Sequence, residues 1–259
     1  MTNATLKNRM RRGDTLAGTF LKTPAHDLIE VLAMSGLDFV CLDAEHAPFD
    51  RARMDSCLAV GRALHFPILV RVPDGTSSEL LKALDSGATG VVVPHVATKE
   101  KAADIARWSR FGHGGRGYAG SSRWAGFATR PMSEILEQSE EETIVIGQIE
   151  EPEGVAAIDK IAATKGLDGV FVGPADLAVC LGETDINAAP VLDAMKTVAN
   201  AASRNGIAAM TFTPDAEGAK ALFDCGITTF FIGSDHAFAL ATAKRIAADV
   251  HAIPSIDDK

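Results

Sequence analysis

The chain has 259 residues, of which 47% are hydrophobic, and a formal net charge of −9 at pH 7. The acidic residues are scattered and no basic stripe is present, which argues against nucleic acid as a partner. No run of 18 uncharged apolar residues occurs, and no apolar run follows the basic residues at the start, so we expect neither a membrane span nor a signal peptide. The length suits one large domain, and we expect a single domain over residues 1–259.

Eight short apolar runs, rich in β-branched and aromatic residues, alternate with longer amphipathic segments. They predict strands at 16–20, 39–44, 67–72, 90–96, 143–149, 169–173, 207–213 and 228–234. Near-continuous apolar strands that alternate with helices indicate a parallel sheet, and eight of them favour a closed (β/α)₈ barrel of the TIM type. An open dinucleotide-binding sheet is less well supported, because no GxGxxG follows the first strand.

The segment between the fourth and fifth strands is unusually long and contains a glycine-rich stretch, 111–131. Such a stretch is unsuited to a continuous helix, and long irregular loops in compact domains are often functional lids. Arg116 and Arg123 within it would suit an anionic ligand. The alternative is a flexible insertion without a function of its own.

The four cysteines are far apart and form no CxxC pair; they are Cys41, Cys57, Cys180 and Cys225. This spacing favours reduced thiols in the core over a disulfide framework or a zinc site. Together with the absence of a signal peptide, it predicts a cytoplasmic protein.

Polar residues stand where four of the predicted strands end, and the active site of such a barrel forms at these carboxyl ends. They are Asp43, Glu45 and His46 after the second strand, Arg71 at the third, Gln148 and Glu150 at the fifth, and the turn 173–176 after the sixth. We expect all of them to face one mouth.

Glu150 and Asp176 lie one strand–helix unit apart, which places them on neighbouring strands with axes about 4.8 Å apart. Two carboxylates brought this close share either a proton or a cation. With no Cys or His beside them, the pair favours Mg²⁺ or Mn²⁺. The alternative is that each acid only stabilises the start of the helix that follows it.

The remaining mouth residues suit a carboxylate substrate and proton transfer. Gly173 and Pro174 would open a helix whose free N–H groups can bind an anion. Arg71, leaving an apolar strand, needs a carboxylate from the substrate or from the protein, such as Asp43 or Asp85. A carboxylate at Asp43 could fix the tautomer of His46, as proton transfer near neutral pH requires. Phe212 would either support a substrate tail or fill the barrel.

Four segments in this order resemble the HpcH/HpaI family of class II pyruvate aldolases. They are "DAEHAPFD" (43–50), "VRVP" (70–73), "GQIEEPEG" (147–154) and "GVFVGPADLAVCLG" (169–182). The resemblance extends over residues 5–250 and implies a TIM barrel of the phosphoenolpyruvate/pyruvate superfamily type. It implies metal-dependent, reversible cleavage of 4-hydroxy-2-keto acids to an aldehyde and pyruvate, or a related 2-keto acid such as hydroxypyruvate. The implied cofactor is Mg²⁺, Mn²⁺ or Co²⁺.

The same resemblance assigns roles to individual residues. It implies that Glu150 and Asp176 hold the metal, that Arg71 contacts the keto oxygen, and that His46 with Asp43 transfers the proton. Residues around the substrate would be Gln148, Gly173, Pro174, Ala175 and Asp176. Asp85 would reach a neighbouring subunit's site in a homohexamer, a trimer of dimers that exchange the C-terminal helix, here 235–249.

Three other functions remain open from the sequence. A Schiff-base aldolase would need a lysine inside the barrel, and Lys22, just after the first strand, is the nearest candidate. A citramalyl- or malyl-CoA-type lyase shares the fold and the acid pair, but the chain has no basic tract for a nucleotide diphosphate. A non-catalytic barrel that binds a keto acid would have no use for His46 beside Asp43.

Overall fold

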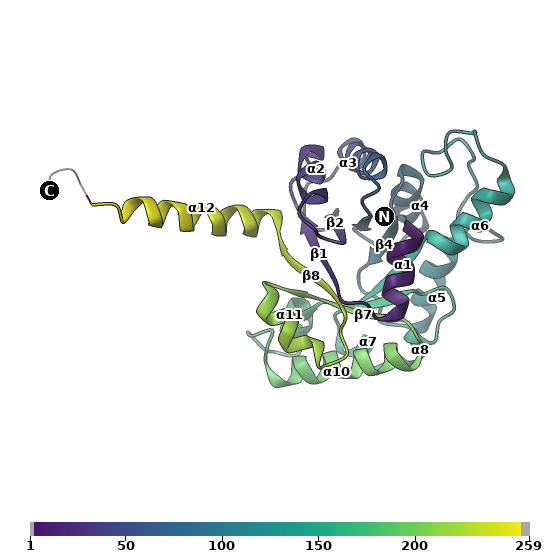
Figure 1. Cartoon of the computed structure of the whole chain (residues 1–259). Helices are drawn as coiled ribbons and strands as arrows, with labels where there is room; N and C mark the ends of the chain where they lie inside the picture. The colour runs from purple at the N-terminus through teal and green to yellow at the C-terminus, as the bar shows by residue number, and fades with distance from the viewer. Residues whose placement is uncertain (1–2, 255–259) are drawn as a thin grey trace.

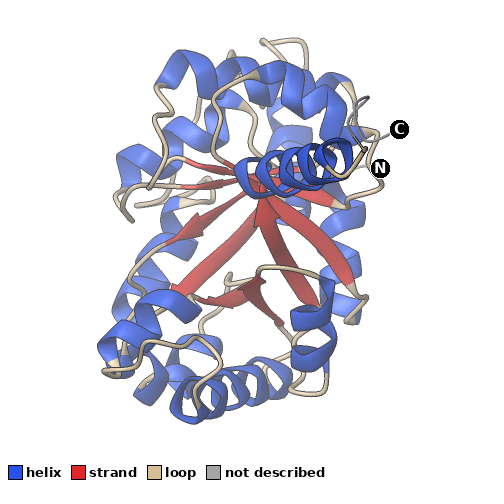
Figure 2. Ribbon diagram, turned by 90° about the vertical axis from the view of Figure 1, so that its left-hand side faces the viewer, coloured by secondary structure: helices blue, strands red, loops and turns tan. Residues whose placement is uncertain are grey.

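The computed structural model describes residues 3–254, and its parallel strands pair in chain order into a closed eight-stranded barrel. The strands are β1 (Leu16–Leu21), β2 (Phe39–Asp43), β3 (Ile68–Arg71), β4 (Gly90–Val93), β5 (Ile144–Ile149), β6 (Gly169–Val172), β7 (Ala208–Thr213) and β8 (Thr229–Ser234). Figure 2 shows these strands with helices around them. The predicted TIM barrel is confirmed, since every predicted strand is present.

The helices cover the outside of the barrel and close one of its ends. They are α1 (Asn3–Arg12), α2 (His26–Ala33), α3 (Arg51–Ala63), α4 (Ser77–Ser86), α5 (Lys99–Trp108), α6 (Met132–Glu142), α7 (Pro152–Ala156), α8 (Ile158–Ala162), α9 (Pro174–Cys180), α10 (Ala189–Arg204), α11 (Ala216–Phe223) and α12 (Asp235–His251). Side chains of α1 pack with the residues inside the barrel, and the buried Lys7 ammonium lies 3.1 Å from the Asp168 carboxylate. Helix α1 therefore closes the end opposite the carboxyl ends of the strands.

Side chains alternate along each strand between a core inside the barrel and a core beneath the helices. On β2, Phe39 and Cys41 point inward, while Val40 and Leu42 belong to the outer core. The inner row of β2 therefore ends at Asp43. By the same alternation, the inner row of β3 ends at Arg71, and that of β5 reaches Gln148. The alternation of inward-facing and outward-facing side chains therefore places these polar groups at the mouth.

The segment between α5 and α6 is irregular, as predicted, and has a small core of its own. Trp124, Ala125 and Ile135 pack together with Phe111. Arg123 Nη2 lies 2.7 Å from Asp55 Oδ2. Arg116 is buried against the rings of Phe111 and Trp124, and its guanidinium nitrogens make no hydrogen bond among the described residues. An anionic ligand at these two arginines stays a prediction.

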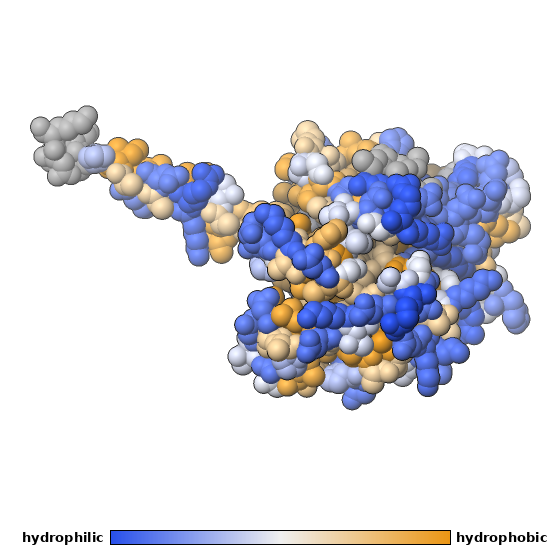
Figure 3. Space-filling model, turned by 60° about the horizontal axis from the view of Figure 1, so that its bottom comes forward, coloured by the Kyte–Doolittle hydropathy of each residue, from blue (hydrophilic) through white to orange (hydrophobic). Residues whose placement is uncertain are grey.

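Helix α12 projects away from the barrel (Figure 1), and none of its residues is buried. Its exposed apolar side chains include Phe238, Leu240, Ile246 and Val250. Figure 3 shows apolar surface along this projecting helix. The barrel of the same chain does not cover these apolar side chains.

Within the described part of the chain, no helix is long and apolar enough to cross a membrane. The cysteines differ from the expectation of four core thiols. Cys41 and Cys57 are buried, but Cys180 is exposed and Cys225 is only partly buried; all four are free.

Candidate active site at the mouth of the barrel

A cavity of about 440 Å³ opens at the carboxyl ends of the strands. Its lining is Phe20, Lys22, His46, Arg71, Gln148, Phe171, Gly173, Pro174, Ala175, Asp176 and Phe212. Every residue predicted to lie around the substrate is in this lining. The lining also contains Phe20, Lys22 and Phe171, which were not predicted to lie around the substrate. Phe20 and Phe171 belong to the inner rows of β1 and β6, and Lys22 directly follows β1.

Asp43 and Arg71 form a buried ion pair at this mouth. Arg71 Nη2 lies 2.8 Å from Asp43 Oδ1, and Arg71 Nε donates to the same oxygen at 3.0 Å. The Lys22 ammonium donates to Asp43 Oδ2 at 2.8 Å. Burial opposes ionisation of Asp43, but the Arg71 charge and these hydrogen bonds outweigh it, so the pKa of Asp43 is lowered. Of the two protein partners proposed for Arg71, Asp43 is thus the one it uses.

His46 does not contact the Asp43 carboxylate through its ring, as the predicted dyad would require. Its backbone N–H donates to Asp43 Oδ1 at 3.1 Å, while its ring Nε2 lies 3.5 Å from Glu45 Oε2. The physical reason is that Arg71 and Lys22 already occupy both Asp43 oxygens. The His46 ring is about half exposed and lines the mouth.

Glu45, predicted only to face the mouth, belongs to this charge cluster. Its Oε2 lies 3.3 Å from Arg71 Nε and makes no hydrogen bond among the described residues. Burial raises the pKa of Glu45, despite the opposing charges of Arg71 and His46.

Glu150 is buried at the end of β5 and is held by hydrogen-bond donors on both oxygens. The backbone N–H of His95 donates to Oε1 at 2.7 Å, and the Gln148 amide donates to Oε2. A Cβ at Gly173 would lie 3.1 Å from Glu150 Oε2, so a side chain there would crowd the carboxylate. Asp176, in the first turn of α9, is exposed to the same mouth.

His95 corrects the expectation that no histidine lies beside the acid pair. Its ring Nδ1 is 3.1 Å from Glu150 Oε1 and 3.0 Å from Glu151 Oε1. The residue adopts a left-handed backbone conformation, φ +57°, which is uncommon outside glycine. That conformation turns its N–H group toward Glu150.

Glu150 and Asp176, the two acids predicted to hold a divalent metal, follow neighbouring strands at this mouth. Among the described residues, no group of three or more His, Cys, Asp and Glu side chains is placed to hold a metal. Mg²⁺ and Mn²⁺ commonly bind through one or two carboxylates and take their other oxygens from substrate and water. The buried Gln148 Oε1, which has no hydrogen-bond partner among the described residues, adds an unsatisfied oxygen beside Glu150.

Asp85 lies outside the mouth of its own chain. It is on α4, 3.7 Å from the buried Arg116 guanidinium, and lines a separate cavity with Arg51, Asp55 and Arg123. Burial raises the pKa of Asp85 against the opposing charge of Arg116. Asp85 therefore does not contribute to the mouth of its own chain, and its predicted role at a neighbouring subunit's site stays a prediction.

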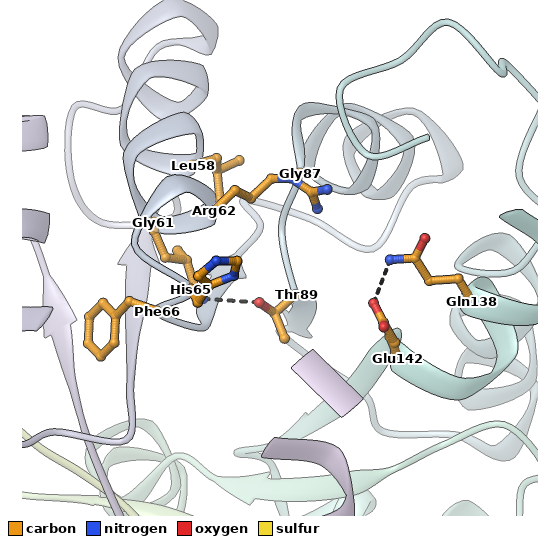
Figure 4. A pocket seen from close by; sticks show the side chains of 10 residues that line it. Leu58, Gly61, Arg62, His65, Phe66, Gly87, Thr89, Gln138 and Glu142 are labelled. Carbon is orange, nitrogen blue, oxygen red and sulfur yellow. Dashed lines mark hydrogen bonds between the residues drawn. The ribbon is translucent and has the colours of Figure 1, made fainter. Parts of the chain in front are cut away.

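A further cavity, of about 210 Å³, lies at the opposite end of the barrel (Figure 4). It is bounded by residues that precede or begin strands, among them Phe66, Thr89 and Glu142, and Figure 4 shows the Arg62 side chain beside it. None of the predicted site residues reaches it, and we do not assign the chemistry to it.

Comparisons with known proteins agree with this geometry. The family model described as HpcH/HpaI aldolase/citrate lyase matches residues 16–241. A hydroxypyruvate/pyruvate aldolase of Paraburkholderia phytofirmans is 34% identical over 95% of this chain and 96% of its own. A 5-keto-4-deoxy-D-glucarate aldolase of Shigella sonnei is 35% identical over 84% of this chain and 85% of its own. The crystal structure of an HpcH/HpaI aldolase/citrate lyase family protein from Burkholderia cenocepacia superimposes with a TM-score of 0.91 at 34% identity, covering 96% of this chain and 100% of that one.

Proposed function

The chain belongs to the HpcH/HpaI aldolase/citrate lyase family, and we propose that it cleaves 4-hydroxy-2-keto acids reversibly to a 2-keto acid and an aldehyde. Membership confirms the resemblance carried by the four sequence motifs and makes the protein a carbon–carbon lyase of the class II aldolases. The 2-keto acid product is pyruvate or hydroxypyruvate. The observation that carries the proposal is the meeting of Arg71, Gln148 and the turn 173–176 in one cavity beside the buried Glu150.

Glu150 and Asp176 are the residues we propose to hold the divalent metal, Mg²⁺, Mn²⁺ or Co²⁺. Such an ion would supply Lewis-acid stabilisation of the negative charge that develops when the carbon–carbon bond breaks. Gln148 and the His95 N–H group fix the direction of the Glu150 carboxylate, as partners of metal ligands commonly do.

Arg71 and the start of α9 are proposed to bind the keto acid. The Arg71 guanidinium would stabilise negative charge on the keto oxygen in a site with little water. Asp43 holds that guanidinium in place through the buried ion pair. The N–H groups at the start of α9, which begins at Pro174, would receive the substrate carboxylate.

His46 is proposed to move the proton of the aldehyde oxygen. Its ring lines the mouth, and Glu45 lies beside it. Cleavage requires removal of the hydroxyl proton, and addition requires its return; an imidazole can accept and donate that proton. In this assignment Asp43 positions Arg71 and the His46 backbone, and it makes no contact with the His46 ring.

The Schiff-base alternative is weakened by the surroundings of Lys22. Its ammonium donates to the buried Asp43 carboxylate at 2.8 Å. A Schiff-base lysine must present its nitrogen to the substrate carbonyl. The Lys22 nitrogen is instead directed at Asp43. No observation in the structure favours a CoA-ester lyase or a non-catalytic barrel.

We further propose that the enzyme is a cytoplasmic homohexamer, a trimer of dimers in which α12 packs on a neighbouring subunit. The absence of any buried residue in α12, together with its apolar side chains, supports the exchange, and the free cysteines support a reducing compartment. Light scattering should give a hexamer for the full chain and a smaller assembly for Ile246→Asp. A monomeric full chain would exclude the exchange.

The reaction is tested by incubating the protein with a panel of 4-hydroxy-2-keto acids and measuring pyruvate and hydroxypyruvate release. Glu150→Gln should release neither above background, because it removes a proposed metal ligand. Glu153→Gln, an exposed position on α7, is the matched control and should behave as the wild type. If the wild type cleaves no member of the panel with a divalent metal present, the proposed reaction is wrong.

A further inference from the structure

The cavity of about 210 Å³ at the amino ends of the strands has opposite charges on its two sides. Arg62, in the last turn of α3, lies on one side, and Glu142, the last residue of α6, lies on the other (Figure 4). No ion pair joins these two described side chains. The space between them is therefore open to a ligand that contacts both.

Arg62 lacks a counterion, although the arginines near it have theirs. Arg123 and Arg130 have acidic partners at 2.7 Å and 3.5 Å, whereas Arg62 makes neither an ion pair nor a hydrogen bond among residues 3–254. Burial lowers the pKa of Arg62, and the charges of Arg123 and Arg130 lower it further, against the charge of Glu142. A guanidinium stays charged at neutral pH, so its N–H groups can bind a carboxylate of a ligand.

Gly87 leaves room for the Arg62 side chain at the edge of the cavity. It caps α4 in a left-handed conformation, and a Cβ there would lie 2.6 Å from Arg62 Cδ and 3.3 Å from Arg123 Cδ. The two arginine side chains thus pack over the same glycine. This packing keeps the Arg62 guanidinium near a second positive charge and beside the cavity.

The side opposite Arg62 suits a cation. Gln138 Nε2 donates to Glu142 Oε2 at 2.6 Å and fixes the direction of that carboxylate, while Oε1 accepts from no residue of the described chain. Helices α3, α4 and α6 all end around the cavity. The carboxyl end of a helix carries a partial negative charge, which attracts cations and repels a simple anion.

From these contacts we infer that the cavity binds a small zwitterion, a free α-amino acid, with its carboxylate at Arg62 and its ammonium at Glu142. Leu58 and Ile68, both buried in the lining, would contact an aliphatic side chain. The cavity is smaller than the roughly 300 Å³ at which sites for drug-sized ligands begin, so it suits a small amino acid such as valine. No mouth residue lines it, and the inference does not depend on the proposed aldolase function.

The test compares valine with two matched analogues by isothermal titration calorimetry on the full chain. Isovalerate keeps the carboxylate without the ammonium, and isobutylamine keeps the ammonium without the carboxylate. The wild type should bind one valine per chain, about tenfold or more tightly than either analogue.

Variants assign the binding to this cavity. Arg62→Gln and Glu142→Gln should each weaken valine binding by about tenfold or more, and Arg62→Lys should weaken it less than Arg62→Gln. Arg53→Gln and Glu141→Gln, at exposed positions on the same two helices, are the controls for a change in charge and should bind valine as the wild type does. Melting temperatures show which variants are folded.

Four results would overturn the inference. The first is a wild type that binds no valine at millimolar concentrations, and the second is valine binding that persists in folded Arg62→Gln or Glu142→Gln, which would place the ligand elsewhere. Isovalerate that binds as tightly as valine would make the cavity an oxyanion site, and isobutylamine that does so would make it an ammonium site. If one variant does not fold, the other variant and the two analogues still decide.

Discussion

Asp43 and Arg71 occupy aligned positions on β2 and β3, and Arg71 Nη2 lies 2.8 Å from Asp43 Oδ1. The strand pairing therefore fixes the position of the guanidinium before any substrate arrives. Because Asp43 also accepts from Lys22 and from the His46 backbone, one buried carboxylate orients three neighbours at the mouth. Two predictions follow from the two members of this pair.

Arg71→Ala should lower kcat/KM for aldol cleavage by roughly a hundredfold or more, on the order of 3 kcal/mol of transition-state stabilisation. The substitution also removes a partner from a buried carboxylate, so the melting temperature should fall. Arg53→Ala, an exposed arginine on α3, is the control for loss of a charge. A folded Arg71→Ala protein with near-normal kcat/KM would show that Arg71 does not contact the reacting atoms.

Asp43→Asn should destabilise the protein in a pH-dependent manner. The pKa of Asp43 is lowered in the folded protein, so its ionised form contributes stability above the unfolded pKa of about 3.9 and loses it as the pH falls through the folded value. The difference in unfolding free energy between wild type and variant should be steady between pH 8 and about pH 5, then shrink below about pH 4. Urea titrations across this range measure it, and a pH-independent difference would contradict the assignment.

His46→Ala should leave metal affinity intact, because the proposed ligands lie at the ends of β5 and β6. Aldol cleavage should fall by roughly 10² to 10⁴, the usual effect of losing a general acid or base. Exchange of the pyruvate methyl protons and decarboxylation of oxaloacetate should fall less, since neither involves the aldehyde oxygen. His113→Ala, an exposed loop histidine, is the control.

The His46 variant separates three roles. Loss of metal binding would make His46 a ligand, and an equal fall of all activities would make it a substrate-positioning residue. Only the selective loss of aldol cleavage supports proton transfer.

The alternation of side chains along each strand, inward and then outward, explains how much of the site could be predicted. Alternation along β2 and β3 brings Asp43 and Arg71 to the inner rows, so their meeting follows from the pattern of apolar residues. The same alternation continues the inner row of β1 from Phe20 to Lys22. Lys22, proposed from the sequence only as a nucleophile, occupies a position that this alternation assigns to the mouth.

Other features depend on geometry that the residue pattern does not encode. The contact of His95 with Glu150 occurs at a non-glycine residue with a left-handed backbone conformation. The residue pattern indicates only that His95 follows a strand and is near the mouth. The ring of His46 turns to Glu45 because Arg71 and Lys22 compete for Asp43. Helix α12 leaves the barrel without burying any of its residues, a direction that no residue pattern in the sequence predicts.

The central claim, a metal-dependent aldolase with ligands at Glu150 and Asp176, is tested most directly by removing the metal. Wild-type protein stripped with a chelator should release no pyruvate from a 4-hydroxy-2-keto acid that it otherwise cleaves, and added Mg²⁺, Mn²⁺ or Co²⁺ should restore the release. Glu150→Gln should not be restored under the same conditions. Full activity after thorough chelation, with borohydride trapping the substrate on Lys22, would contradict the claim.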